Sequence, residues 1–232
     1  MLYKLAWDTR CRNVDVRDLL RQFPSASILD AGCGEYGLAA FMPRSNITGV
    51  DVLPPERVDP RLNYKYGSIT ELPFENGAFD IAVSIDVLEH LPEDVRAAAV
   101  GELVRVARKA IIIAFPSGPA AREMDETFAH ELKASSQPLP DWLEEHLAQL
   151  YPDTENIIAA VEKAAAKDGR NTAISVSYSE HLSVAKFLRS RALRSKYGYI
   201  AANLMTGLLS PLMPNASGES SYRSIVVAEL AK

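Results

Sequence analysis

Residues 27–37 have the sequence Ser-Ile-Leu-Asp-Ala-Gly-Cys-Gly-Glu-Tyr-Gly, a short apolar run that leads directly into a glycine-rich turn. Gly32, Gly34 and Gly37 fit the pattern G-x-G-x-x-G, which is typical of a turn that holds a nucleotide where a strand passes into a helix. Such a turn can also serve only to pack a helix against a strand. Asp51 favours a nucleotide, because it ends the next apolar run at roughly the 20-residue offset from which a carboxylate binds ribose hydroxyl groups.

Charges around the turn separate two classes of nucleotide ligand. Asp30 and Glu35 bracket the first two glycines, and no basic residue lies near them in the sequence. A dinucleotide would place its pyrophosphate against these carboxylates and be repelled at short range. S-adenosylmethionine has no phosphate and carries an ammonium and a sulfonium group, for which an acidic turn is favourable. The turn therefore predicts a cationic ligand.

Apolar runs alternate with helical patterns through the first half of the chain. Residues 16–23 carry apolar side chains at helical spacing before Pro24, and a second helix is expected from Pro92 to about Arg108. Strands that alternate with helices at this spacing indicate parallel βαβ units with helices on both sheet faces, which is an α/β, doubly wound fold. Strands are expected at residues 27–30, 47–51, 63–67, 79–85, 110–115, 173–178 and 222–230.

Three blocks of sequence extend the pattern beyond the glycine turn. They are residues 28–34, residues 48–51, and the stretch from Leu72-Pro73-Phe74 through Phe79-Asp80 to Asp86-Val87-Leu88-Glu89-His90-Leu91. In this combination the chain resembles a class I S-adenosylmethionine-dependent methyltransferase with a type 11-like methyltransferase domain. The resemblance covers about the first half of the chain. It implies a Rossmann-like sheet in the strand order 3-2-1-4-5-7-6, with strand seven antiparallel.

The resemblance also implies which residues hold the cofactor. The glycine turn would bind the methionine moiety, the carboxylate that closes the second strand would bind the ribose hydroxyl groups, and three later segments would meet the adenine or the sulfonium. The implied residues are Asp30, Gly32, Cys33 and Gly34 for methionine, Asp51 for ribose, Val52, Ser68 and Ile69 for adenine, and Asp86 and Val87 beside the sulfonium and adenosine. Tyr36 and Ser68 depart from the residues that the family commonly has at these positions.

Histidines supply the candidates for chemistry outside the cofactor site. His90 is a candidate general base for an oxygen nucleophile, although the Leu-Glu-His segment can equally have a structural role. His130 and Glu131 lie in a segment expected to face the methyl-acceptor pocket, which makes them substrate candidates. His146 is expected to be packed or solvated on a helix. No cluster with metal-ligand spacing is visible, so no metal site is predicted.

The chain is interpreted as a single methyltransferase domain, residues 1–232, with two helical additions. Residues 1–116 form the cofactor-binding half, and 117–171 form a helical insert that is a lid or wall of the acceptor pocket or covers a sheet edge. Residues 172–232 hold the last two strands with a helical excursion, 181–218, between them. The excursion is expected to be a packed cap, with a membrane contact through 181–213, a dimer surface or an anionic-substrate site as alternatives. Asp141 is expected to begin a helix with capping-box spacing.

Composition restricts the location and the partners. The chain has 232 residues, 47% of them hydrophobic, and a formal net charge of −5, which offers no global attraction to nucleic acid. Two cysteines, Cys11 and Cys33, form neither a disulfide framework nor a zinc-ligand spacing. The N-terminal residues lack the apolar segment of a secretory signal. A cytoplasmic protein is therefore expected, and its oligomeric state is left open.

Methyl transfer from S-adenosylmethionine, with S-adenosylhomocysteine as product and without a metal, is the function that the sequence favours. The acceptor is expected to be a small molecule or to be linked to a lipid or a glycan. Two alternatives stay open. The chain could bind S-adenosylmethionine without catalysis, because Tyr36 and Ser68 are unusual, or it could be a nicotinamide-dependent oxidoreductase, which the acidic turn disfavours.

Overall fold

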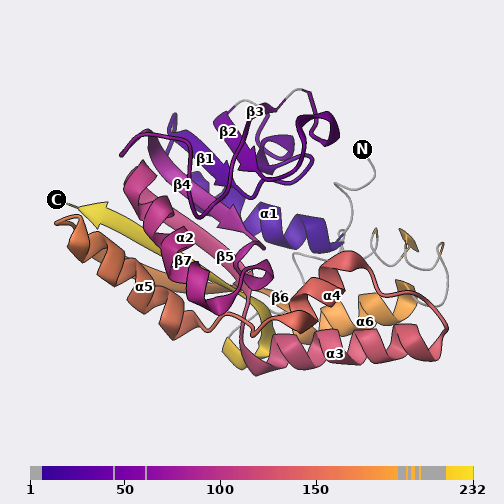
Figure 1. Ribbon diagram of the computed structural model, residues 1–232. Helices are drawn as coiled ribbons and strands as arrows, with labels where there is room; N and C mark the ends of the chain where they lie inside the picture. The colour runs from indigo at the N-terminus through magenta and orange to yellow at the C-terminus, as the bar shows by residue number, and fades with distance from the viewer. Residues whose placement is uncertain are drawn as a thin grey trace.

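A seven-stranded sheet forms the centre of the protein in the computed structural model, which describes residues 7–43, 45–60, 62–192, 197, 200, 201, 204 and 218–231 (Figure 1). The strands are β1 (Ser27–Ala31), β2 (Asn46–Asp51), β3 (Asn63–Tyr66), β4 (Phe79–Ile85), β5 (Ala107–Pro116), β6 (Asn171–His181) and β7 (Ser221–Ala231). Their order is β3-β2-β1-β4-β5-β7-β6. Strand β7 runs antiparallel to both β5 and β6, and the other pairs are parallel. The predicted fold class and strand order are confirmed.

Helices cover both faces of this sheet. Helices α1 (Trp7–Leu20), α2 (Glu93–Val106) and α5 (Thr154–Lys167) pack on its faces. Leu103 of α2 and Val161 of α5 are buried in one core cluster on one face, and Val16 and Leu20 of α1 are buried in a second cluster on the other face. Each such side chain contributes roughly 1.5–3 kcal/mol through its burial. Because both faces are covered, residues 81–84 of β4 and 110–116 of β5 are buried without alternation.

A second group of helices lies at one end of the sheet, beside the ends of β4 and β5 (Figure 1). It consists of α3 (Gly118–Ala134), α4 (Asp141–Ala148) and α6 (Leu182–Ala192). Helix α3 contacts both α4 and α6, and α4 contacts the 3₁₀ turn Leu88–His90 that follows β4. The segment 117–171 is therefore divided between two places, since α3 and α4 lie at the sheet end while α5 packs against α2 in the core.

Several element boundaries differ from those predicted. Helix α1 ends at Leu20, short of Phe23, and α2 ends at Val106, because the chain continues directly into β5 at Ala107. Asp141 does not cap α4: it is the first helical residue, Pro140 precedes it, and no side chain caps that helix. The side-chain cap is instead found on α5, where Asp153 accepts hydrogen bonds from the backbone N–H groups of Glu155 and Asn156 at 3.0 and 3.1 Å.

The excursion between β6 and β7 begins with α6. Arg189 of this helix turns inward and pairs with Asp125 of α3. Phe187 is about half exposed, at 48%. The stretch predicted to contact a membrane is 181–213, and its residues after 192, except 197, 200, 201 and 204, lie outside the described residues. Within the part of the chain that the structure describes, no helix is long and apolar enough to cross a membrane.

Candidate functional site

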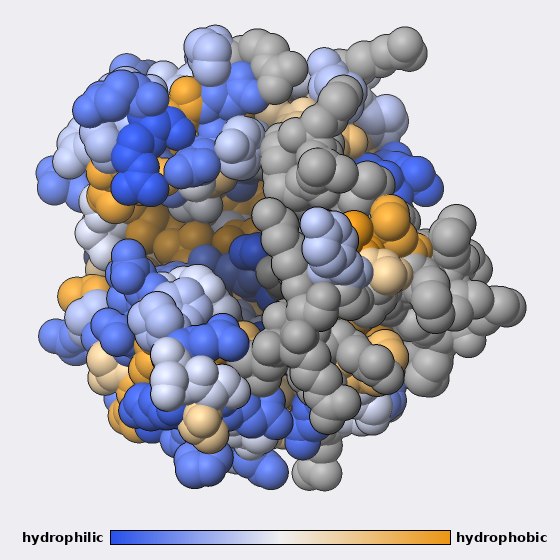
Figure 2. Space-filling view, turned by 90° about the vertical axis from the view of Figure 1, so that its right-hand side faces the viewer, coloured by the Kyte–Doolittle hydropathy of each residue, from blue (hydrophilic) through white to orange (hydrophobic). Residues whose placement is uncertain are grey.

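A cavity of about 790 Å³ opens where the carboxyl ends of β1, β2 and β4 meet, which is the position at which doubly wound sheets bind ligands. Figure 2 shows this side of the molecule, with a deep hollow in which apolar and hydrophilic residues lie next to each other. All ten predicted cofactor residues and His90 line the cavity. The remaining lining residues include Arg12, Asn13, Glu35, Tyr36, Leu38, Phe41, Leu53, Arg57, Leu91, Trp142 and Glu145.

The glycine turn lies tightly against the loop that follows β4. Gly32 has a φ of +81°, and a Cβ atom built on it would lie 2.2 Å from Cγ2 of Val87. No side chain fits there, so glycine is required by both the backbone conformation and the contact. Gly34 also has a positive φ, +59°, but the space around it is open. The turn and Val87 therefore form one continuous wall of the cavity.

Asp30 is buried beneath this turn. Its Oδ2 accepts a hydrogen bond of 2.6 Å from the backbone N–H of Leu38, which fixes the chain as it leaves the turn. Burial raises the pKa of Asp30 to about 6, the hydrogen bond from Leu38 opposes this rise, and the nearby charge of Asp51 adds to it. The carboxyl group thus supports the turn from below, and its charge changes close to neutral pH.

Asp51 connects the turn to the end of β2. Its Oδ2 accepts from the N–H of Gly34 at 2.8 Å, and its Oδ1 accepts from the N–H of Leu53 at 3.1 Å. Each carboxylate oxygen can accept a second hydrogen bond, so both remain able to bind a hydroxyl group in the cavity. Burial, followed by the charges of Asp30 and Asp51, raises the pKa of the Cys33 thiol, which disfavours a reactive thiolate there.

Val52, Ser68 and Ile69, the residues predicted to meet adenine, follow strands β2 and β3. Val52 is largely exposed, at 61%, whereas Ile69 is buried. The Ser68 hydroxyl group lies 2.8 Å from that of Thr70 and accepts a hydrogen bond of 3.2 Å from the Thr70 N–H. These contacts hold the segment after β3 in a turn that faces the cavity.

Asp86 is paired with arginines, a partnership that the sequence does not predict. Arg223 of β7 binds both of its oxygens, with Nε–Oδ1 and Nη2–Oδ2 distances of 2.6 and 2.8 Å. Arg12 of α1 lies 3.2 Å from Oδ2, and Arg223 also donates to Glu180 at 2.8 Å. Asp86 has a φ of +54°. Its negative charge is therefore balanced within the protein, and it contributes less to attracting a cation than Asp30 and Asp51 do.

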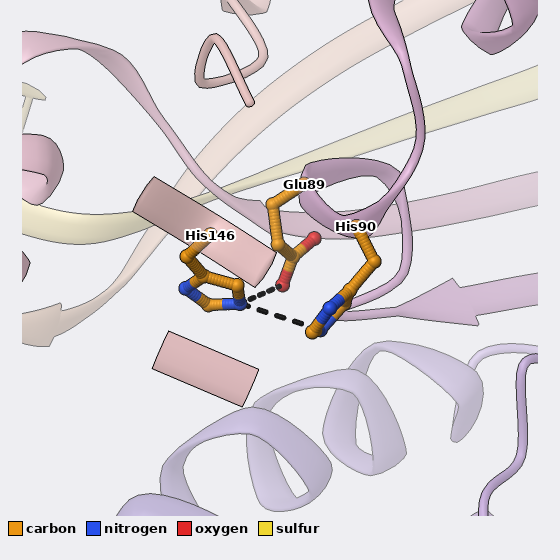
Figure 3. Close-up of side chains that lie close together, drawn as sticks. All are labelled: Glu89, His90 and His146. Atoms are coloured by element: carbon orange, nitrogen blue, oxygen red, sulfur yellow. Dashed lines mark hydrogen bonds and ion pairs between the residues drawn. The ribbon is translucent and has the colours of Figure 1, made fainter. Parts of the chain in front are cut away.

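Three side chains next to the cavity converge on one point. Glu89 and His90 belong to the 3₁₀ turn after β4 and His146 to α4, and Figure 3 shows all three directed toward one another. The Nε2 atoms of the two histidines are 3.3 Å apart, and Nε2 of His146 is 3.7 Å from Oε1 of Glu89. His146 is buried, as the packed alternative predicted. The sequence predicts no metal-ligand cluster, but these three residues form one that could hold a metal ion.

Carboxylates hold the outer nitrogens of both histidines. Nδ1 of His90 is 2.6 Å from Oε2 of Glu145, and Nδ1 of His146 is 3.0 Å from Oδ2 of Asp125. Burial and the neighbouring His146 lower the pKa of His90, although Glu145 opposes this effect. The imidazole of His90 is thus favoured in its neutral form, with its ring held in place by Glu145.

Asp125 is the centre of a hydrogen-bonded group that joins four segments. Its carboxylate accepts from the hydroxyl groups of Tyr151 at 2.5 Å and Tyr222 at 2.9 and 3.1 Å, and it forms an ion pair with Arg189. Burial opposes its charge, but the hydrogen bonds and the Arg189 charge hold the pKa of Asp125 at about 2. Helices α3, α4 and α6 and strand β7 are thereby fixed to one another beside the cavity.

The two predicted substrate residues lie elsewhere. His130 is exposed and Glu131 half-buried on α3, and neither lines the cavity. The residues of the insert that do line it are Trp142 and Glu145, one turn of α4 apart. Sequence analysis did not select them, nor Arg12, Asp125 or Arg223. The spacing of Trp142, Glu145 and His146 is a sequence signal for this group, because residues three and four positions apart are neighbours on one face of a helix.

A protein-family model described as a methyltransferase domain matches residues 29–115, from β1 to near the end of β5. An O-methyltransferase from Pyrenophora dematioidea is 31% identical to this chain over an alignment of 114 positions, which covers 43% of this chain and 42% of that protein. The chain therefore spans less than half the length of this relative. The residues that the family model matches include the glycine turn and the carboxyl ends of β2 and β4.

Solved structures resemble the fold over nearly the whole chain. An S-adenosylmethionine-dependent methyltransferase from Thermotoga maritima has a TM-score of 0.59 and 18% identity, covering 100% of this chain and 92% of that chain. The magnesium protoporphyrin IX methyltransferase of Synechocystis, solved with bound S-adenosylhomocysteine, has a TM-score of 0.52 and 15% identity, covering 94% and 81%. At these identities the likeness concerns the fold.

Proposed function

Because residues 29–115 form a class I S-adenosylmethionine-dependent methyltransferase domain, we propose that the protein transfers a methyl group from S-adenosylmethionine to a small-molecule, lipid-linked or glycan-linked acceptor. One observation carries this proposal. The ten residues that the sequence assigns to the cofactor come from four separate segments, and all ten line a single cavity. The cavity volume of about 790 Å³ lies in the range of small-molecule sites.

The residues present fit the cofactor by their chemistry. Asp51 keeps free acceptor capacity for ribose hydroxyl groups, Asp30 and Glu35 give the turn a negative charge that suits an ammonium and a sulfonium, and Gly32 leaves room where any side chain would collide with Val87. When bound, S-adenosylmethionine supplies a methyl group that is already activated on sulfur. The task left to the protein is to hold and align the acceptor and to exclude water.

His90 is placed for positioning more than for proton abstraction. It lines the cavity, but Glu145 binds its Nδ1 and its Nε2 faces His146. A general base needs an unoccupied nitrogen within hydrogen-bond reach of the acceptor proton. With both nitrogens directed at protein groups, His90 forms part of the cavity wall, as Trp142 does.

Calorimetric titration with S-adenosylhomocysteine tests the cofactor assignment, with NADH as the parallel ligand. We expect micromolar binding of S-adenosylhomocysteine, none of NADH, and a loss of at least about 10-fold in affinity for Asp51→Ala, since a buried hydroxyl group loses a charged hydrogen-bond partner worth roughly 1.5–3 kcal/mol. Asp94→Ala removes an exposed carboxylate on α2 and is the matched control. Binding of NADH alone, or unchanged affinity in Asp51→Ala, would overturn the assignment.

Turnover is tested separately from binding. Release of S-adenosylhomocysteine is measured with panels of hydroxylated, phenolic and amine acceptors, free and attached to lipid or sugar. Turnover with one chemical class and not the others identifies the acceptor. Tight cofactor binding without turnover on any panel would instead support a binding protein that lacks catalysis.

A further inference from the structure

We propose that Glu89, His90 and His146 bind a divalent transition-metal ion in the wall of the cavity. The three side chains come from two segments that are far apart in the sequence, and their nearest ligand atoms all lie within 4.8 Å of one another. Figure 3 shows the carboxylate and both imidazole rings directed at the same point. Two histidines and one carboxylate are a ligand set found in zinc enzymes and in non-haem iron sites.

The distances suit an ion between the rings. A metal ion that holds two imidazole nitrogens at about 2.0–2.1 Å in tetrahedral geometry separates those nitrogens by about 3.3 Å. The Nε2 atoms of His90 and His146 are 3.3 Å apart. Oε1 of Glu89 is 3.7 Å from Nε2 of His146, so a small side-chain rotation brings it into the same coordination sphere.

Hydrogen bonds on the far side of each ring prepare the histidines as ligands. Because Nδ1 of His90 faces Glu145 and Nδ1 of His146 faces Asp125, each Nδ1 carries the proton and donates it to a carboxylate. The two Nε2 atoms are then left with lone pairs that point at each other. Carboxylate–histidine pairs of this kind orient the ligands of bound metal ions and increase their basicity.

Glu89 supplies an independent reason for a cation. Its side chain is completely buried, and neither carboxylate oxygen has a hydrogen-bond partner among the residues that the structure describes. The Asp86 carboxylate nearby is paired with Arg223 and Arg12, so those arginines are already engaged. A buried carboxylate without a partner is unfavourable, and a divalent ion held against it removes that cost.

The position of the site relates the ion to the acceptor, a relation that rests on the proposed function. His90, Trp142 and Glu145 line the cavity, whereas Glu89 and His146 lie behind them. Three protein ligands leave at least one coordination position, and the cavity side is the side from which a small molecule can reach it. The ion would therefore favour acceptors that present a donor atom able to coordinate it. Two imidazole ligands favour Zn²⁺, Co²⁺ or Fe²⁺ over Mg²⁺.

Metal binding is measured directly, without an activity assay. The full chain is treated with a chelator, dialysed, and titrated with Zn²⁺, Co²⁺ and Mg²⁺ by calorimetry, and the visible absorption of the Co²⁺ complex reports nitrogen and oxygen ligation. We expect one equivalent of Zn²⁺ or Co²⁺ to bind with micromolar or tighter affinity, and Mg²⁺ to bind at least about 100-fold more weakly.

Four variants locate the ion. His146→Ala and Glu89→Gln should each lose at least about 100-fold in Zn²⁺ affinity. Glu145→Ala changes an exposed side chain that holds His90 from outside, so it should fold normally and lose about 10–100-fold, as second-shell partners do. His130→Ala, which removes an exposed histidine of α3, should bind as the wild type does. If the buried variants fail to fold, Glu145→Ala against His130→Ala carries the test.

Two results would overturn the site: no Zn²⁺ or Co²⁺ binding by the wild type at millimolar concentration, or equal affinity in wild type and Glu145→Ala. The first result would indicate that a proton shared between the two imidazoles occupies the space. S-adenosylhomocysteine is titrated into the same metal-free samples. Cofactor binding without metal binding refutes only the metal site, and metal binding without cofactor binding refutes only the proposed function.

Discussion

Adding one methyl group to the glycine turn tests how tightly it is packed against the loop after β4. Gly32 and Gly34 both have positive φ angles, so Gly→Ala places an L side chain in the left-handed region at either position, at roughly 1–2 kcal/mol. The reduced entropy of the unfolded chain returns about 0.4–1 kcal/mol in both cases. The surroundings differ: the new Cβ would lie 2.2 Å from Val87 at position 32 and in open space at position 34.

The difference between the two variants therefore isolates the contact. Displacing a packed neighbour costs typically 1–3 kcal/mol, so Gly32→Ala should lower the free energy of unfolding by about 2–4 kcal/mol and Gly34→Ala by about 1 kcal/mol. Val87→Ala removes both Cγ atoms, of which Cγ2 is the one in collision. In the double variant Gly32→Ala/Val87→Ala, we expect at least about 1 kcal/mol of the Gly32→Ala cost to be recovered relative to the sum of the single changes.

Urea unfolding followed by circular dichroism measures all four proteins. S-adenosylhomocysteine titration on the same samples shows whether the cavity wall has moved. Equal destabilisation by Gly32→Ala and Gly34→Ala, or single changes that simply add in the double variant, would refute the close approach of the turn to Val87.

Three further measurements address charges and caps. The pKa of Asp30 is about 6 in the folded protein against 3.8 for the free side chain, so the folded state binds an extra proton between these values, and the free energy of unfolding should fall by up to about 3 kcal/mol as the pH rises from 4 to 6. Asp30→Asn should flatten that part of a urea-unfolding pH series, and an unchanged slope would assign it to other groups. Arg223→Met leaves Asp86 and Glu180 without their shared cation and should cost about 3–5 kcal/mol in thermal unfolding, less when combined with Glu180→Gln. Asp153→Ala removes the cap of α5 and should cost about 1 kcal/mol in urea unfolding, whereas Asp141→Ala, which caps nothing, should change stability by less than about 0.5 kcal/mol.

The cofactor half of the molecule could be predicted from the sequence because its signals are local. Residues 28–34 combine a buried strand with a glycine turn, and Asp51 lies at the end of the very next strand. Parallel strands bring their carboxyl ends to one edge, so the position of each residue along its own strand determines where it lies in the site. The strand order followed from the resemblance rather than from periodicity.

The group of polar residues beside the cavity, which includes His90, Asp125 and His146, could not be predicted in the same way because its contacts are long-range. His146 meets His90 across 56 positions of the chain, and Asp125 meets Tyr222 across 97. Nothing in the local sequence of α4 distinguishes a histidine that is merely packed from one that faces a second histidine. His130 lies in the insert, as a substrate residue should, but its place on the helix directs it outward. Only the packing of α3, α4 and β7 determines which polar residues converge.

The contacts of Asp125 affect how this protein could be re-engineered or could diverge from its relatives. Its partners come from α4, the loop before α5, α6 and β7, and two of them, the Arg189 cation and Tyr222, lie outside the insert. A chimera that receives another protein's residues 117–171 would leave Arg189 and Tyr222 facing a foreign side chain. A successful graft must carry the insert, the start of the excursion and the beginning of the last strand together. These three parts are thus structurally interdependent.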